Sequence, residues 1–196
     1  MLAVLAIACG LSAWDALYPS NTWLQVGPVA FVLPLAGWAL LRWPLSNLAV
    51  GCVTAFLLLH LFAAHWTYSF VPYNAWLIDA FGFDLDRAMG FSRNMIDRVI
   101  HGSFGLLMVC PLAEIGRRHL RVGPVLAVIG AVQFVWAISA LYEVFEWALT
   151  MSLSPQDAGT YNGEQGDRFD AQKDMALACI GAMLAAVPVW LARKPT

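Results

Sequence analysis

Ionisable side chains recur at helical spacing inside separate apolar stretches of this sequence. Asp97 and His101 are four residues apart, which places them on one face of a helix. Tyr142 and Glu143 are followed, one turn further on, by Glu146. A third group continues the pattern at spacings of three and four residues and comprises Asp167, Asp170 and Asp174. Because such groups are costly to place in an apolar stretch, we take them as candidates for function.

Imidazoles and carboxylates together are the usual ligands of divalent metal ions in proteins. A set of oxygen ligands alone favours magnesium or calcium, whereas a histidine favours zinc or another transition metal. A metal with an open position can activate water to hydrolyse an ester or phosphate. Without a metal, the same groups can act as a proton relay or a general acid–base pair. The candidate metal ligands are His60, His101, Glu143, Asp170 and Asp174.

The remaining roles divide between catalysis and substrate binding. The candidate catalytic residues are Asp97, His101, Glu143, Glu146 and Asp170. The candidate substrate-binding residues are Tyr68, Arg93, Arg98, Tyr142 and Asp167. Guanidinium groups suit a phosphate or a carboxylate, and the phenols can donate hydrogen bonds. His60, Asp97 and Asp167 are further candidates for supporting ligands.

Each of these residues also has a purely structural interpretation. Asp97 can cap the helix that it opens, as Asp167 or Asp170 can cap a later one. Arg98 can form an intramembrane ion pair with Glu143 or Glu146, and His60 can form a hydrogen bond between helices. His65 lies in the aromatic segment HWTYSF, which suits anchoring at the membrane interface. The clustering of so many polar groups at one end of the expected helices favours a functional site.

The elements that must position these groups are membrane helices. Apolar residues form 60% of the 196 residues and charged residues 12%, against about 45–50% and about 25% in soluble domains. This composition and the net charge of −2 exclude a soluble globule, a disordered chain, a coiled coil and a nucleic-acid-binding protein. We expect a single all-α domain, a polytopic bundle of about six transmembrane helices. The expected spans are about 2–18, 24–41, 47–68, 97–116, 124–150 and 172–191.

Basic residues predict the orientation of this bundle. They follow the second, fourth and sixth spans and comprise Arg42, Arg117, Arg118, Arg121, Arg193 and Lys194. The positive-inside rule therefore places both termini in the cytoplasm of a bacterial inner membrane, with the long connections 69–96 and 151–171 facing outward. The first segment lacks a basic leader and is interpreted as a membrane helix rather than a signal peptide. The four cysteines are scattered in apolar stretches without a CxxC pair, so we interpret them as buried apolar residues.

Several segments resemble known membrane proteins. The stretches HWTYSFVPY, RNMIDRVIHGSFG, ISALYEVFEW and QGDRFDAQKDMALACIGA, within residues 57–190, resemble signature sequences of the YjdF-like bacterial inner-membrane proteins. More loosely, the D-x-x-x-H of Asp97 and His101, the glutamate Glu143 and the spaced aspartates that end with Asp174 are similar to the VanZ-like superfamily, which typically has Asn at that last position. The first resemblance implies a small multispan protein without an established reaction. The second implies a role at the cell envelope.

These observations lead to one functional hypothesis and two alternatives. We expect an outward-facing polar pocket in which a divalent metal assists hydrolysis or group transfer on a lipid or lipid-linked envelope substrate, with the connection 151–171 closing over it. The first alternative is a proton- or cation-coupled carrier, which would need a polar route that continues to the cytoplasm; Gln133 and Ser139 are exceptions in otherwise apolar final spans. The second alternative is a structural or accessory membrane protein whose acids and histidines only cap and bridge helices.

Overall fold

The computed structural model describes residues 1–154, 158–159, 161 and 163–192, and within these ranges it is helical without strands. The connection 151–171 is therefore described only in part, and Arg193 and Lys194 lie outside the described residues. In chain order the helices are α1 (Leu2–Ala13), α2 (Pro19–Arg42), α3 (Asn47–His65), α4 (Tyr73–Phe81), α5 (Leu85–Met89), α6 (Ile96–Arg118), α7 (Pro124–Thr150) and α9 (Asp170–Leu191).

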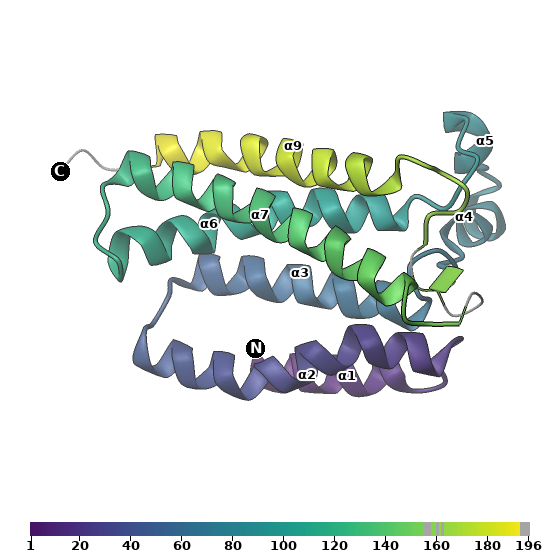
Figure 1. Cartoon of the computed structure of the whole chain (residues 1–196), viewed down its shortest axis with the longest axis horizontal. Coiled ribbons are helices and arrows are strands. Elements are labelled where there is room, and N and C mark those ends of the chain that lie inside the picture. The colour runs from purple at the N-terminus through teal and green to yellow at the C-terminus, as the bar shows by residue number, and fades with distance from the viewer. Residues whose placement is uncertain (155–157, 160, 162, 193–196) are drawn as a thin grey trace.

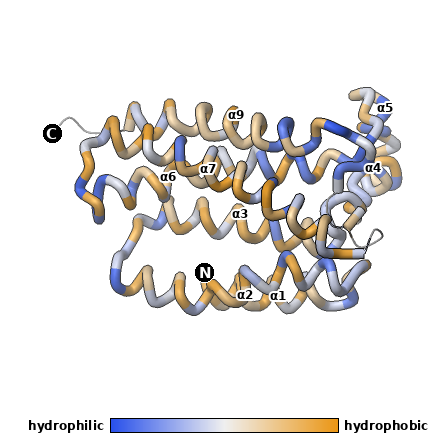
Figure 2. The backbone as a smooth tube through the Cα atoms, in the orientation of Figure 1, coloured by the Kyte–Doolittle hydropathy of each residue, from blue (hydrophilic) through white to orange (hydrophobic). Residues whose placement is uncertain are grey.

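Five long helices and the shorter α1 form two groups of three that lie side by side (Figure 1). Helices α6, α7 and α9 contact one another in one group, and α1, α2 and α3 do so in the other. Among the described helices, α3 and α6 are the pair that joins the two groups. Apolar residues run along the long helices, whereas hydrophilic residues gather toward their ends and most densely around α4 and α5 (Figure 2).

Five of these helices are long and apolar enough to cross a membrane, namely α2, α3, α6, α7 and α9. This confirms the expected polytopic helical bundle. The first segment is shorter than the expected 2–18, because α1 has only 12 residues, a length of about 18 Å against about 30 Å of hydrocarbon. It ends at Ala13 because Trp14 is extended and Asp15 has a φ of 49°. Helix α2 begins earlier than the expected residue 24, at Pro19, where proline favours the first turn.

Glycines allow α6 and α9 to cross closely. A Cβ atom on Gly105 would collide with the carbonyl oxygen of Ala178, and a Cβ atom on Gly181 would collide with that of Gly102. Small residues at a crossing let helix backbones approach and pack in a membrane, where lipid supplies no hydrophobic drive for association. The crossing fixes the register of the two helices, and one turn before Ala178 it brings Asp174 against α6.

The two ends of the bundle differ in their charges. The connection from α2 to α3 and that from α6 to α7 lie at the end of the bundle where α9 ends (Figure 1). Arg42, Arg117, Arg118 and Arg121 belong to this end, while α4, α5 and the start of α9 lie at the opposite end. The described residues thus confirm the separation of the basic helix ends from the cluster of acids. The N-terminus lies between the two ends because α1 is short, and the orientation in the membrane stays a prediction.

The connection 69–96 is folded into the short helices α4 and α5, which lie beyond the end of the long helices (Figure 1). Tyr73 donates a hydrogen bond of 2.7 Å to Asp86, and Asn74 donates one of 3.1 Å to Asp84. Burial and the bond to Asp86 raise the pKa of Tyr73 to about 12. The carboxylate of Asp84 caps α5 by accepting from the N–H of Arg87, which lowers the pKa of that aspartate.

Candidate functional site

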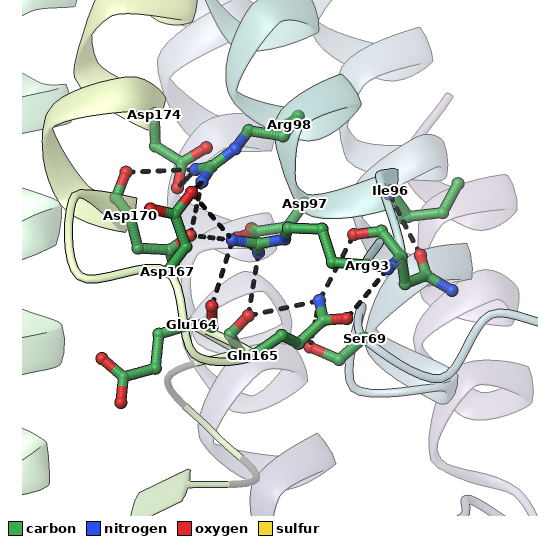
Figure 3. Close-up of polar contacts among 12 residues, drawn as sticks. Ser69, Arg93, Ile96, Asp97, Arg98, Glu164, Gln165, Asp167, Asp170 and Asp174 are labelled. Atoms are coloured by element: carbon green, nitrogen blue, oxygen red, sulfur yellow. Dashed lines mark hydrogen bonds and ion pairs between the residues drawn. The ribbon is translucent and has the colours of Figure 1, made fainter. Parts of the chain in front are cut away.

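Arg98 is at the centre of a buried ion-pair network between α6 and the start of α9 (Figure 3). Its side chain is only 7% exposed. The guanidinium donates to Asp170 at 2.6 Å and to Asp167 at 3.1 Å, and it also pairs with Asp174. The structural interpretation predicted that Arg98 pairs with Glu143 or Glu146. This prediction is wrong, because the α6–α9 crossing places the aspartates at the start of α9 next to the guanidinium group.

Arg93 extends this network to the segment that precedes α9. It pairs with Asp170 and donates to the carbonyl oxygens of Gly163 at 2.9 Å and Glu164 at 3.2 Å. Gln165 strengthens the same junction, because its side-chain oxygen accepts from the N–H of Asn94 at 2.8 Å. The arginines are predicted to bind a phosphate. Carboxylates and carbonyls of the chain already contact both guanidinium groups, so a phosphate would have to compete with them.

Asp167 lies at the exposed edge of the network. Lys173 donates a hydrogen bond of 2.6 Å to its carboxylate, and this lowers the pKa of Asp167. The N–H of Phe169 also donates to it, at 3.1 Å. Asp167 therefore helps to order the start of α9 and lies next to Arg98, at the edge of a polar pocket.

His101 lies one turn deeper in α6, where a possible ligand set for a metal converges. Its Nε2 atom is 3.6 Å from an oxygen of Asp97 and 3.7 Å from an oxygen of Glu143. Asp97, His101 and Asp174 each offer a ligand atom, and these atoms lie within 4.8 Å of one another. All three side chains are largely buried. Two separate helices, α6 and α9, thus supply one imidazole and two carboxylates to a common point.

Two carboxylate oxygens at this point have no hydrogen-bond partner among the described residues. They are Oδ1 of Asp174, whose side chain is 2% exposed, and Oε1 of Glu143, whose side chain is 9% exposed. A buried carboxylate oxygen without a hydrogen-bond partner costs free energy, so a native structure needs a reason for it. A cation bound by Asp97, His101 and Asp174 would satisfy the free oxygen of Asp174.

The number of acidic residues around these oxygens supports a bound cation. The carboxylates in or beside the network are Asp97, Glu143, Glu146, Asp167, Asp170 and Asp174. The cations are Arg93, Arg98 and Lys173. Among the described residues, six acidic groups against three basic ones leave carboxyl groups without a basic partner in a partly desolvated place, which favours binding of a metal ion or of protons.

His60 forms the hydrogen bond between helices that its structural interpretation predicted, and it does not join the metal-ligand set. Its Nε2 atom lies 3.3 Å from the carbonyl oxygen of Gln25, and its Nδ1 atom lies 2.6 Å from the hydroxyl of Tyr68. A carbonyl can only accept, so Nε2 carries the proton and Nδ1 accepts from the phenol. His60 is therefore held by α2 and by Tyr68 and lies outside the convergent ligand set. Thr67 and Tyr68 have positive φ angles of 45° and 56°, and this turn directs the phenol back to α3.

The other predicted residues lie near the convergent ligand set without completing it. The ring of Tyr142 stacks edge-on against His101 at 5.9 Å. Glu146 lies beside Tyr142 and Tyr161, and burial together with that glutamate raises the pKa of Tyr161 to about 12. Asp170 is occupied by the arginines. Of the predicted metal ligands, the structure brings His101 and Asp174 together, adds Asp97 to them and places Glu143 beside them.

A cavity of about 210 Å³ adjoins this ligand set on its inner side. Its polar lining consists of His60, Tyr68, Asp97, His101, Ser139 and Tyr142. The rest of the lining is aliphatic or phenylalanine, from α2, α3, α6 and α7. A second pocket of about 290 Å³ is lined by Glu143, Asp170 and the charged residues that precede α9. The His101–Glu143 contact thus lies between an apolar cavity and a polar one.

Sequence reasoning missed the contacts that lock the site. The carbonyls of Gly163 and Glu164, the side chain of Gln165 and the carbonyl of Gln25 carry no recognisable signal in a single sequence. Asp97 was assigned to catalysis and named only as a supporting or additional ligand, whereas the structure places it in the ligand set beside His101.

Comparison with known proteins gives a consistent picture of the chain. A family model described as "Predicted membrane protein (DUF2238)" matches residues 1–195. The chain is 32% identical over 188 residues to "Inner membrane protein YjdF" of Escherichia coli (strain K12), covering 95% of this chain and 84% of that protein. No solved structure matches. The YjdF-like resemblance is thereby confirmed, while the VanZ-like resemblance stays a prediction.

Proposed function

The chain belongs to the DUF2238 family of predicted membrane proteins, and we propose that it is an inner-membrane, metal-assisted hydrolase or transferase acting on a lipid or lipid-linked substrate. The proposal is carried by one observation, the convergence of Asp97, His101 and Asp174 within 4.8 Å beside an apolar cavity. An inner-membrane location is supported by the relative from E. coli, which is described as an inner membrane protein.

The donor set suits a divalent metal with a preference for zinc or another transition metal, because it combines one imidazole with carboxylates. Magnesium or calcium would rely on the oxygens alone. Such an ion supplies Lewis acidity and a water of lowered pKa. The unpartnered oxygen of Asp174 and the adjacent carboxylate of Asp97 would hold it together with Nε2 of His101.

The residues around the ligands would divide the remaining work. Glu143 has an oxygen 3.7 Å from His101 without a hydrogen-bond partner among the described residues, so it can accept a proton from a water beside the metal. Tyr142 lines the cavity and can donate to a developing oxyanion, whereas Tyr68 lines it with a hydroxyl that already donates to His60. Arg93 and Arg98 would orient the aspartates through their ion pairs, as supporting groups orient the ligands at other metal sites.

The experiment is elemental analysis of protein purified in detergent, with His101→Ala as the test variant. His119→Ala is the matched control, because that histidine lies at the far end of α6 and contacts the carbonyl of Pro44. We expect stoichiometric metal in the native protein and the control and its loss in His101→Ala. If metal is absent from all three proteins after incubation with zinc, manganese or magnesium, the proposed mechanism is wrong.

A carrier or proton-relay function would use the same excess of negative charge. It predicts metal-independent proton movement in vesicles that depends on Glu143, whereas the hydrolase or transferase predicts none. The two functions are separated by measuring vesicle pH with native protein and with Glu143→Gln.

A further inference from the structure

We infer that the 210 Å³ cavity binds a hydrocarbon chain. The chain enters laterally from the bilayer between α2 and α7, and its polar head group is placed next to Asp97 and His101. The inference rests on the proposed function. It narrows the class of substrate to amphiphiles whose hydrocarbon chain moves from the bilayer into the cavity of the protein.

On this side of the cavity the backbones of the described helices α2 and α7 are not in contact. The cavity is lined by Val29 from α2 and Ile138 from α7, with α3 and α6 behind them. Helix α2 contacts α3, α3 contacts α6 and α6 contacts α7, but among the described helices α2 and α7 make no direct contact. In a bundle that crosses the membrane, an entry between these two helices would face lipid. A chain can therefore reach the cavity without passing through water.

The lining divides the cavity into an apolar part and a polar rim. Phe56, Ile100 and Phe104 belong to the apolar part, whereas Asp97 and His101 are on the wall that adjoins the ligand set. An engineered cavity of about 150 Å³ accommodates benzene, so 210 Å³ has room for a segment of roughly six to eight carbons. The rest of a longer chain would stay in the bilayer.

The position of the polar groups explains what the cavity would achieve. Because lipid tails are already in an apolar medium, moving a chain into the cavity yields little hydrophobic free energy. What it gains is orientation, since a head attached to a seated chain is held beside the reacting groups. The expected signature is therefore the location of the chain in the protein rather than a high affinity.

The experiment is photocrosslinking in phosphatidylcholine vesicles with a palmitoyl monoacylglycerol that carries a diazirine in its chain. Ser139→Trp fills the cavity, because Ser139 lines it and is 2% exposed. Ala137→Trp is the matched control, since this residue is exposed on another face of the same helix. We expect crosslinks on the cavity segments of α3 and α6 in the native protein and the control, and their loss in Ser139→Trp.

A second variant covers the case in which Ser139→Trp does not fold. Phe104→Ala enlarges the cavity, so cavity crosslinks should extend to diazirines placed further along the chain. Labelling that is spread over the lipid-facing helices and is unchanged in Ser139→Trp and Phe104→Ala would overturn the inference. This readout needs no metal, so an empty cavity and a failed metal site are distinguished by crosslinking and elemental analysis respectively.

Discussion

Replacement of Arg98 by glutamine tests whether the ion-pair network holds α6 and α9 together. The side chain is 7% exposed and contacts Asp167, Asp170 and Asp174. Removing one partner of a buried ion pair costs about 3–5 kcal/mol, because the remaining charges stay buried without compensation. Arg93 still pairs with Asp170 in the variant, so we expect a loss near the lower limit, about 3 kcal/mol. For a chain of this size, this lowers the melting temperature by roughly 6–12 °C.

Thermal unfolding in detergent can be followed with a thiol-reactive dye, because Cys9 is buried and becomes reactive on unfolding. Arg118→Gln is the control, since Arg118 lies on the same helix and pairs with Glu114 at 3.3 Å within that helix, with a side chain that is 52% exposed. Exposed pairs contribute about 0–1 kcal/mol. Adding Asp174→Asn to Arg98→Gln should recover about 1–3 kcal/mol. Equal, small losses in Arg98→Gln and Arg118→Gln would refute the reasoning.

Three further predictions concern the crossing, the histidine–tyrosine pair and the outer connection. Gly105→Ala should destabilise the protein by about 1–3 kcal/mol through overpacking, whereas Gly102→Ala, with open space at its Cβ position, should be neutral in the same melt; equal effects contradict the close crossing. Tyr68→Phe should cost about 0.5–1.5 kcal/mol by removing the 2.6 Å bond to His60, and the Nε2-protonated tautomer of that histidine should be seen by ¹⁵N NMR in the native protein but lose its definition in the variant. Burial and a carboxylate hydrogen bond raise the pKa of Tyr73 to about 12, above the unfolded value of about 10. The contribution of Tyr73 to the stability of the α4–α5 segment is therefore complete below pH 10 and is lost as pH rises toward 12. Subtilisin should cut between α4 and α5 faster at pH 11 than at pH 9, and Tyr73→Phe should reduce that difference.

The helical architecture was predictable because it depends on composition and length. Long apolar stretches leave few alternatives to membrane helices, and the bounds of α7 agree with the expected 124–150. The error at α1 has a local cause, since hydropathy continues past residue 13 while the backbone turns at Asp15. Hydropathy reports where a chain can be buried and carries no information about where its backbone turns.

The site was predictable in its location and only partly in its partners. Spacing along α6 placed Asp97 and His101 on one face, and the structure keeps them 3.6 Å apart. Partners between helices depend on the α6–α9 register, which the close approach at Gly105 sets and which no single-helix pattern encodes. For this reason Asp170 was expected as a ligand but is held by arginines.

His60 shows the same limit in a different form. Its position in an apolar stretch was correctly taken as unusual, but its partners are a backbone carbonyl of α2 and a phenol beyond the end of α3. Neither partner is marked by spacing, since one is main chain and the other returns through a turn with positive φ angles. The separation of polar groups by bundle end was visible in the sequence, whereas their pairing within that end required the fold.

X-ray absorption at the zinc edge of zinc-loaded protein tests the proposed metal centre most directly. A zinc ion held by Asp97, His101 and Asp174 should give an ordered shell of nitrogen and oxygen at about 2.0–2.2 Å with the outer scattering of one imidazole. This shell should be lost in Asp174→Asn and in His101→Ala. A shell with sulfur at about 2.3 Å, or a spectrum that neither substitution changes, would place the ion elsewhere and contradict the account.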